Sequence, residues 1–208
     1  MKNLINYIKE GLKITSKTKV NEKPKYNYYP KDKEELKDIL SERLKKDKNA
    51  NLNDIDVSKI EEMSTLFVNL DPHNIDISKW DVSNVKNMWW MFLNCYKFDS
   101  DLSYWNVSNV TNINGMFLNC YKFDSDLSNW DVSNVENMYG MFGGCNNFDS
   151  DLSNWDVSNV KDMESMFLNC DKFTGKGLET WNVSNVKNMK RMFKDCPLEK
   201  NLPKWYKR

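Results

Sequence analysis

Five cysteines are the most conspicuous reactive side chains, and they recur every 25 or 26 residues: Cys95, Cys120, Cys145, Cys170 and Cys196. Thiolates bind zinc only when they converge on one metal, at about 2.3 Å. Residues related by a stacked repeat instead lie in a line, roughly 5 Å apart. Neighbouring thiols in such a line approach disulfide spacing, but the count is odd and no export signal is visible. We therefore predict buried, reduced cysteines, with no metal and no cofactor.

Acidic turns are a second candidate for chemistry. The sequence Asp-Ser-Asp recurs at Asp99/Asp101, Asp124/Asp126 and Asp149/Asp151, so stacked repeats would bring carboxylates together into a calcium ladder. Calcium needs about six to eight oxygen ligands, and Thr174 and Lys176 interrupt the series. Asp and Ser also bond to their own backbone in turns. The sequence favours this turn role over a calcium ladder. Repulsion along the row would make stability sensitive to pH or divalent ions.

Catalytic residues are sparse. His73 is the only histidine, and it occupies the repeat position that Phe98 and Phe123 hold later in the chain. No base accompanies a serine nucleophile, and no glycine-rich phosphate loop is present. We therefore predict that the chain is not an enzyme.

A repeat positions all these residues. The pattern W-[DN]-V-S-N-V-x-x-[MI]-x-x-M-F-x-x-C-x-x-F-D-S-D-L-S-x starts at Trp80, Trp105, Trp130 and Trp155, and a fifth copy starts at Trp181. A degenerate copy begins at Ile55 and a truncated one at Trp205. A fixed period of this length is the signature of a solenoid, in which each unit buries its apolar face against its neighbours.

The apolar spacing within a unit predicts its local structure. Trp105 and Val107 lie two residues apart, as on one face of a short strand. The next apolar residues lie three or four positions apart, as on one face of a helix, and Ser108 or Asn109 would cap that helix. These apolar residues are Val110, Ile113, Met116, Phe117 and Cys120. We therefore predict coils of strand, helix and turn whose strands pair in a parallel sheet. Trp, Val, Met, Phe and Cys would form core columns, and the Ser and Asn of VSNV would form ladders.

The run L-x-x-W-x-V at Leu102–Val107 fits the strand of a leucine-rich repeat. The longer string W-[DN]-V-S-N-V-x-N-M-x-x-M-F-x-x-C, seen from Trp80 to Cys95, resembles BspA-type leucine-rich repeat surface proteins, including the repeats common in mycoplasmal surface proteins. The resemblance covers about residues 51–205. It implies an α/β solenoid, a leucine-rich-repeat-like right-handed array of short parallel strands and short helices, on a cell-surface protein that binds host or neighbouring-cell proteins.

Three segments are expected: an amphipathic helix and linker over 1–24, an N-terminal cap of strand plus helix over 25–50, and the solenoid with about six coils and a truncated C-terminal cap over 51–208. The capping helix is predicted from Asp32, which opens a capping box with Glu35, and from an apolar stripe; the stripe is Leu36, Ile39, Leu40 and Leu44. Residues 1–14 would dock on the array, or would contact a membrane surface or another subunit.

The distribution of charged residues along the chain indicates which kinds of partner are not expected. Residues 1–50 hold 14 Lys/Arg against 8 Asp/Glu, residues 51–185 hold 8 against 20, and residues 186–208 hold 8 against 2. An acidic middle repels phosphate, so no nucleic acid is expected on the main surface. No transmembrane segment and no signal peptide are evident. Cell-surface, cytoplasmic and particle-associated locations therefore stay open.

The remaining candidates belong to a partner-binding surface. On the predicted strand face they are Tyr104 and a row comprising Asp81, Asn106, Asp131, Asp156 and Asn182. Trp89 and Trp90 form one odd aromatic pair, which either packs under the N-terminal helix or is a hot spot for a partner. We therefore predict a non-enzymatic protein-binding module for surface adhesion or host interaction. The alternative is a structural or assembly protein of a particle, possibly from a phage, docked by its basic N-terminal segment.

Overall fold

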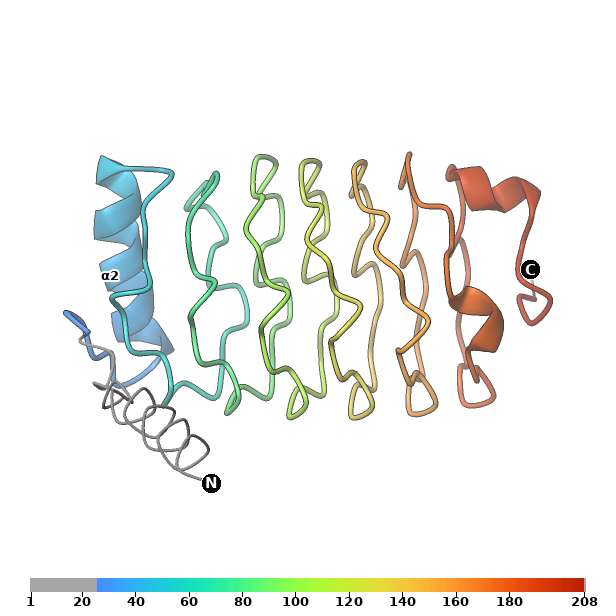
Figure 1. Cartoon of the computed structure of the whole chain (residues 1–208), viewed down its shortest axis with the longest axis horizontal. Helices are drawn as coiled ribbons and strands as arrows, with labels where there is room; N and C mark the ends of the chain where they lie inside the picture. Colours follow the sequence, from blue (N-terminus) through green and yellow to red (C-terminus); the bar gives the residue numbers. More distant parts are fainter. Residues whose placement is uncertain (1–25, 208) are drawn as a thin grey trace, which may run out of the picture.

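The computed structural model describes residues 26–207, which form an elongated stack of coils with a helix at one end (Figure 1). We call each 25- or 26-residue repeat a coil and name it by its first residue, so that the Trp105 coil covers residues 105–129. The helical elements are α2 (Lys33–Lys46) and two 3-10 helices, η1 (Leu178–Thr180) and η2 (Pro197–Lys200). The predicted helix over residues 1–14 lies outside the described residues.

Helix α2 forms as its sequence predicts. The Asp32 side chain accepts a hydrogen bond from the Glu35 N–H, which caps the first turn. Acidic residues occupy the first turn and basic residues the last, as the helix dipole favours. The buried residues are Leu36, Leu40 and Leu44. Because this apolar stripe belongs to the same core as the coils, α2 covers the first end of the stack.

The predicted α/β solenoid with a continuous parallel sheet is wrong. Neighbouring coils within residues 26–207 are joined by backbone hydrogen bonds without forming strands, and the parallel bridges between them are isolated, with one residue from each coil. These bridges include Glu62↔Asn87, Asn87↔Asn112, Asn112↔Asn137, Asn137↔Asp162 and Asp162↔Asn188. The predicted strand at Trp105 and Val107 is a pair of turns, because the Trp105 N–H bonds to the Leu102 carbonyl and the Val110 N–H bonds to the Val107 carbonyl. The segment Tyr26–Tyr29 likewise contributes a single bridge, Tyr28↔Ile55.

The predicted helix in each coil is also wrong, because two positions per coil have left-handed backbone. In the Trp105 coil these are Gly115 (φ 55°) and Asn119 (φ 63°), which interrupt a right-handed helix. Consecutive turns replace the helix: the Leu118 N–H bonds to the Gly115 carbonyl and the Cys120 N–H to the Phe117 carbonyl. These turns place apolar residues three and four apart, as a helix would. Ser108 and Asn109 consequently cap no helix.

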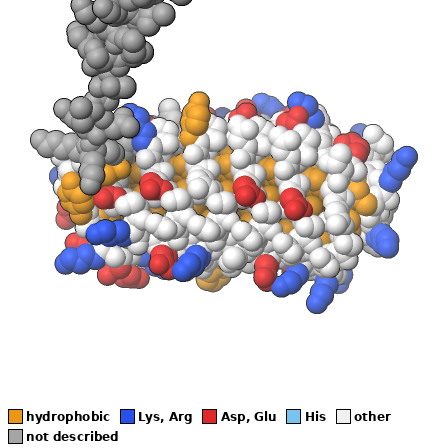
Figure 2. All heavy atoms as spheres, turned by 60° about the horizontal axis from the view of Figure 1, so that its bottom comes forward, with side chains coloured by type: hydrophobic (Ala, Val, Ile, Leu, Met, Phe, Trp, Pro, Cys, Tyr) orange, Lys and Arg blue, Asp and Glu red, His pale blue; other side chains and the backbone are white. Residues whose placement is uncertain are grey.

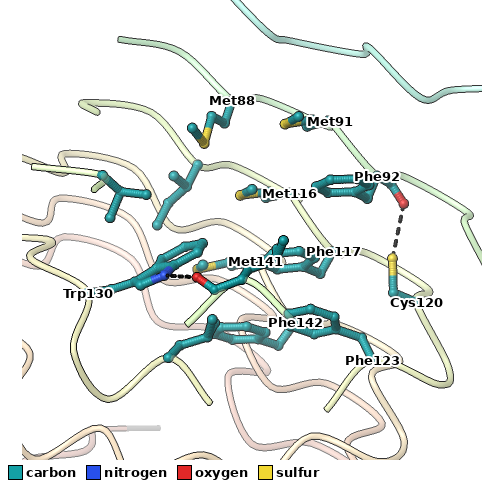
Figure 3. Close-up of a cluster of buried hydrophobic side chains, with 14 of the residues drawn as sticks. Met88, Met91, Phe92, Met116, Phe117, Cys120, Phe123, Trp130, Met141 and Phe142 are labelled. Carbon is teal, nitrogen blue, oxygen red and sulfur yellow. Dashed lines mark hydrogen bonds between the residues drawn. The ribbon is translucent and has the colours of Figure 1, made fainter. Parts of the chain in front are cut away.

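The core consists of columns of identical side chains, as the repeat predicts. Phe117 stacks on Phe142 at 5.9 Å between ring centroids, and on Phe123 of its own coil at 4.0 Å. The Trp130 indole N–H donates to the Leu102 carbonyl, 28 residues earlier in the chain, at 3.0 Å, and Figure 3 draws this bond beside the Met and Phe side chains of the core. Trp80, Trp105, Trp155, Trp181 and Trp205 make the equivalent bond. Each coil therefore completes the core and the hydrogen bonding of its neighbour.

Candidate functional site

The predicted Asp/Asn row is exposed along the side of the stack, and every member is also part of a turn. One side-chain oxygen of each residue accepts from the N–H of the serine two positions later, as in the 3.1 Å bond from Ser83 to Asp81. The row comprises Asp81, Asn106, Asp131, Asp156 and Asn182. Such bonds shape the local backbone. The other carboxylate oxygen of each of Asp81, Asp131 and Asp156 accepts no hydrogen bond from residues 26–207. These three carboxylates therefore present negative charge to the solvent.

A ladder of asparagines beside this row links the coils. The Asn109 side chain donates to the Ser83 carbonyl at 2.7 Å, and Asn134 donates to the Ser108 carbonyl at 2.8 Å. Asn84, Asn159 and Asn185 repeat the contact. The predicted coil-to-coil ladder is therefore confirmed for Asn. The serines of VSNV bond within their own coil instead.

Tyr104 is the most exposed of the large apolar side chains in the described chain, at 85% of its surface. It occupies the position that Lys79, Asn129 and Asn154 hold in other coils. Because its ring takes no part in the core, stability does not explain an aromatic residue here. An exposed aromatic side chain is typical of a binding hot spot.

Trp89 and Trp90 lie 4.5 Å apart between ring centroids and are each half-buried. Trp90 has a left-handed backbone (φ 53°), and its ring fills the space above Gly115, where a Cβ would lie 2.5 Å from Trp90 Cδ1. Its indole N–H is buried and has no acceptor among residues 26–207. The next coil therefore makes room for the pair, and Gly115 is the sequence signal of that fit. Packing under residues 1–14 lies outside the described chain, and the hot-spot role stays a prediction.

The Asp-Ser-Asp turns have a structural role that the sequence analysis missed. The middle serines Ser100, Ser125 and Ser150 are buried. Ser125 Oγ accepts from the Leu102 N–H and Ser150 Oγ from the Leu127 N–H, both at 2.9 Å. The flanking Asp151 contacts Lys176 at 2.9 Å, and this hydrogen bond lowers the pKa of Asp151 to about 2. No group of three or more His, Cys, Asp or Glu within residues 26–207 is arranged to hold a metal ion.

His73 lies near the start of the stack, half-buried, with its Nε2 atom 3.4 Å from Asp71 Oδ2. Its backbone joins two coils, since its N–H bonds to the Lys48 carbonyl and its own carbonyl accepts from Asp99.

The five cysteines are buried and free, as predicted. Cys120 Sγ donates to the Phe92 carbonyl of the preceding coil at 3.0 Å (Figure 3), and Cys145 and Cys170 repeat the contact. Burial raises the pKa of the Cys95 thiol to about 12 and raises those of Cys120 and Cys145 strongly. Because only a thiolate is a good nucleophile, these side chains are inert in the folded protein.

The raised thiol pKa values predict a pH dependence of stability. The ordinary pKa of the thiol is 9.0, so above about pH 9 the unfolded chain loses protons that the folded chain keeps. The buried thiols make their full contribution to stability below about pH 9, and this contribution is lost as the pH rises above that value. We expect the denaturant midpoint to fall between pH 7 and 9.5. We also expect a thiol reagent at pH 8 to label the native protein far more slowly than the unfolded chain.

Cys120→Ala is the control for this prediction, because it removes one buried thiol and should make the fall with pH shallower. Rapid labelling of the native protein, or an unchanged pH slope in Cys120→Ala, would contradict the inert buried thiols.

The outer surface carries charge along the whole stack. Figure 2 shows acidic and basic side chains standing out from a mostly polar surface on the side that it presents. Several of the charges pair between coils, as in Lys86 with Glu61 at 2.6 Å. Within residues 26–207, no helix has the length and apolar character needed to cross a membrane.

A known protein family matches most of this chain. A family described as Mycoplasma protein of unknown function, DUF285, matches residues 35–150 and 103–205. The chain belongs to the DUF285 family. The two DUF285 matches overlap and together run from α2 through the coils to Trp205. No curated protein and no solved structure matches the chain. BspA-type membership is not confirmed, and DUF285 is a family without an assigned function.

Proposed function

We propose that this DUF285 chain is a non-enzymatic binding module that adheres to a protein on the surface of a host or neighbouring cell. Tyr104 carries the proposal, because its ring is 85% exposed and the coils need no aromatic side chain at that position. The Asp/Asn row beside it is rigid, since each member is fixed by its own turn. A rigid row around an exposed aromatic side chain loses little conformational entropy when a partner binds.

A cell-binding assay tests this function. Fluorescently labelled protein is incubated with cultured epithelial cells, and bound label is measured before and after the cells are treated with protease. We expect saturable binding that protease removes, and binding roughly tenfold weaker for Tyr104→Ala. Both proteins should show the same thermal midpoint, because the side chain lies outside the core.

Asn129→Ala is the matched control, since it changes the same position of the next coil without removing an aromatic ring. It should bind nearly as well as the parent protein. An absence of saturable binding, or an equal loss in both variants, would contradict the proposed role of this face.

A further inference from the structure

Within residues 26–207, the coil farthest from α2 leaves a row of backbone N–H groups without acceptors. In earlier coils these N–H groups bond to the next coil: Met163 to Asn188, Ser165 to Lys190 and Phe167 to Met192, at 2.8 to 2.9 Å. The corresponding groups of the Trp181 coil that reach the surface belong to Met189 and Arg191, and they have no acceptor among residues 26–207. The Phe193 N–H also has no acceptor there, but Phe193 is 1% exposed and its ring contacts that of Tyr206. Because the stacking direction is the same throughout, these donors point outward along the long axis of the stack.

Apolar side chains accompany the open donors. Val157, Val160 and Met163 are 0–1% exposed inside the stack. Their counterparts Val183, Val186 and Met189 in the Trp181 coil are only partly buried. Trp205 continues the tryptophan column, stacking on Trp181 at 6.2 Å between ring centroids. Trp205 leaves Val183, Val186 and Met189 partly exposed to solvent. This end therefore combines unpaired donors with exposed core, the combination that makes a sheet edge associate with another chain.

The same end is basic and contains a groove. A cavity of about 400 Å³ at this end is lined by Lys190, Arg191, Phe193, Lys194, Leu202 and Tyr206. Glu199 is the only acidic side chain in the lining. Lys194 has a contact with Asp195 at 3.6 Å, whereas Lys190 and Arg191 have no ion pair among residues 26–207. The groove thus presents positive charge beside the unpaired N–H groups.

We propose that this end binds an extended acidic segment of a partner protein. The partner's alternate carbonyls would accept from the N–H groups of Met189 and Arg191, as the next coil does inside the stack. Its carboxylates would pair with Lys190 and Arg191, and its apolar side chains would cover Val183 and Val186. Addition of an extended chain to an open backbone edge is a common mode of peptide recognition. The inference rests on the proposed binding function and adds to it a second surface and a class of partner.

Two other occupants fit less well. A second copy docked through the same end would bring like charges together, with Lys190 and Arg191 facing their equivalents. A second copy docked through its opposite end would meet α2, whose Leu36, Leu40 and Leu44 already cover that end of the core.

A binding titration tests the proposal. The probe is an acetylated, fluorescein-labelled peptide of alternating aspartate and valine, roughly eight residues long to match a typical strand. A peptide of alternating lysine and valine is the comparison. We expect the acidic peptide to bind, its binding to weaken as salt rises, and hydrogen exchange at the amides of Met189 and Arg191, measured by NMR, to slow when it binds. The basic peptide should do neither.

Charge reversal at the groove supplies the decisive comparison. Lys190→Glu combined with Arg191→Glu should weaken binding of the acidic peptide roughly tenfold or more. Lys97→Glu combined with Lys122→Glu makes the same change in charge on the side of the stack and should leave binding nearly unchanged. Equal losses of binding in the two double variants, no binding of the acidic peptide, or no protection of the amides of Met189 and Arg191 would overturn the proposal. Protection that grows with protein concentration without peptide would assign the end to a second copy.

These results are separable from the cell-binding assay. If the peptide fails to bind while cell binding still depends on Tyr104, only the edge proposal falls. If the cells are not bound but the peptide protects the amides of Met189 and Arg191, the edge proposal survives and the adhesion role falls.

Discussion

Replacing Trp130 with alanine is expected to lower the free energy of unfolding by about 3–5 kcal/mol. The Trp130 ring is 2% exposed and packs against Phe117 at 6.3 Å between centroids. Truncation leaves a cavity between two coils and removes the donor to the Leu102 carbonyl. Because coils are stabilised only by their neighbours, the loss weakens the interfaces on both sides. Chemical denaturation followed by circular dichroism measures the change.

Two variants separate the causes of that loss. Trp130→Phe keeps an aromatic ring but leaves the Leu102 carbonyl without its donor, so we expect a smaller cost of about 1–3 kcal/mol. Asn129→Ala changes the exposed neighbour and should cost little. A small effect of Trp130→Ala, similar to that of Asn129→Ala, would show that the Trp column does not hold the coils together.

Replacing Gly177 with alanine is expected to cost about 3 kcal/mol or more, although it adds only one methyl group. Gly177 has a left-handed backbone (φ 88°), and a Cβ there would lie 2.2 Å from Ser153 N and 2.5 Å from Ser153 Cα. Both atoms belong to the backbone of the preceding coil, so the clash cannot be relieved by rotating a side chain. The coil must separate locally from its neighbour, and thermal unfolding should report a large drop in the midpoint.

Gly140→Ala is the matched control, because it imposes the left-handed strain without the clash. Gly140 has φ 56°, and the nearest atom to an added Cβ is Leu118 Cδ1 at an ordinary 3.8 Å. We expect a cost of about 1 kcal/mol. Equal effects of the two substitutions would indicate that backbone strain alone matters and that the coils are less tightly packed at Gly177 than the distances imply.

The sequence predicts the core well because burial repeats with the coil. Each column position, such as Phe117 or Cys120, is filled by an equivalent residue one repeat away, and this regularity fixes which side chains stack. Helix α2 was also predictable, since its capping residue Asp32 and its leucine stripe are local signals. Both features depend on side-chain type and spacing, which the sequence displays directly.

The backbone of the coils was not predicted, because consecutive turns and a short helix generate the same apolar spacing. The signal that distinguishes consecutive turns from a helix is a residue that readily adopts left-handed backbone at two fixed positions of the coil, as at Gly115 and Asn119. One such residue is typical of a helix end, but two of them four residues apart rule out a helix between them. The leucine-rich-repeat interpretation fails for the same reason, since a turn at Trp105 replaces the expected strand.

The candidate site was predicted in part. Exposure of Tyr104 and of the Asp/Asn row follows from their place opposite the buried columns. The buried role of Ser125 did not follow, because its partner is the Leu102 N–H of another coil. The open N–H groups of Met189 and Arg191 could not be predicted either, since only the pairing between coils reveals which donors lack an acceptor.

The bond from each coil to the next has a consequence for how such a protein changes in evolution. Because all internal coils meet their neighbours through equivalent atoms, inserting another 25 residues between two of them creates one more interface of the same kind and disturbs neither end. The length of the stack can therefore change by whole coils while α2 and the basic groove remain intact. Recombination between the nearly identical coils offers a direct route to such length variants, so related genes should differ in length by multiples of one coil.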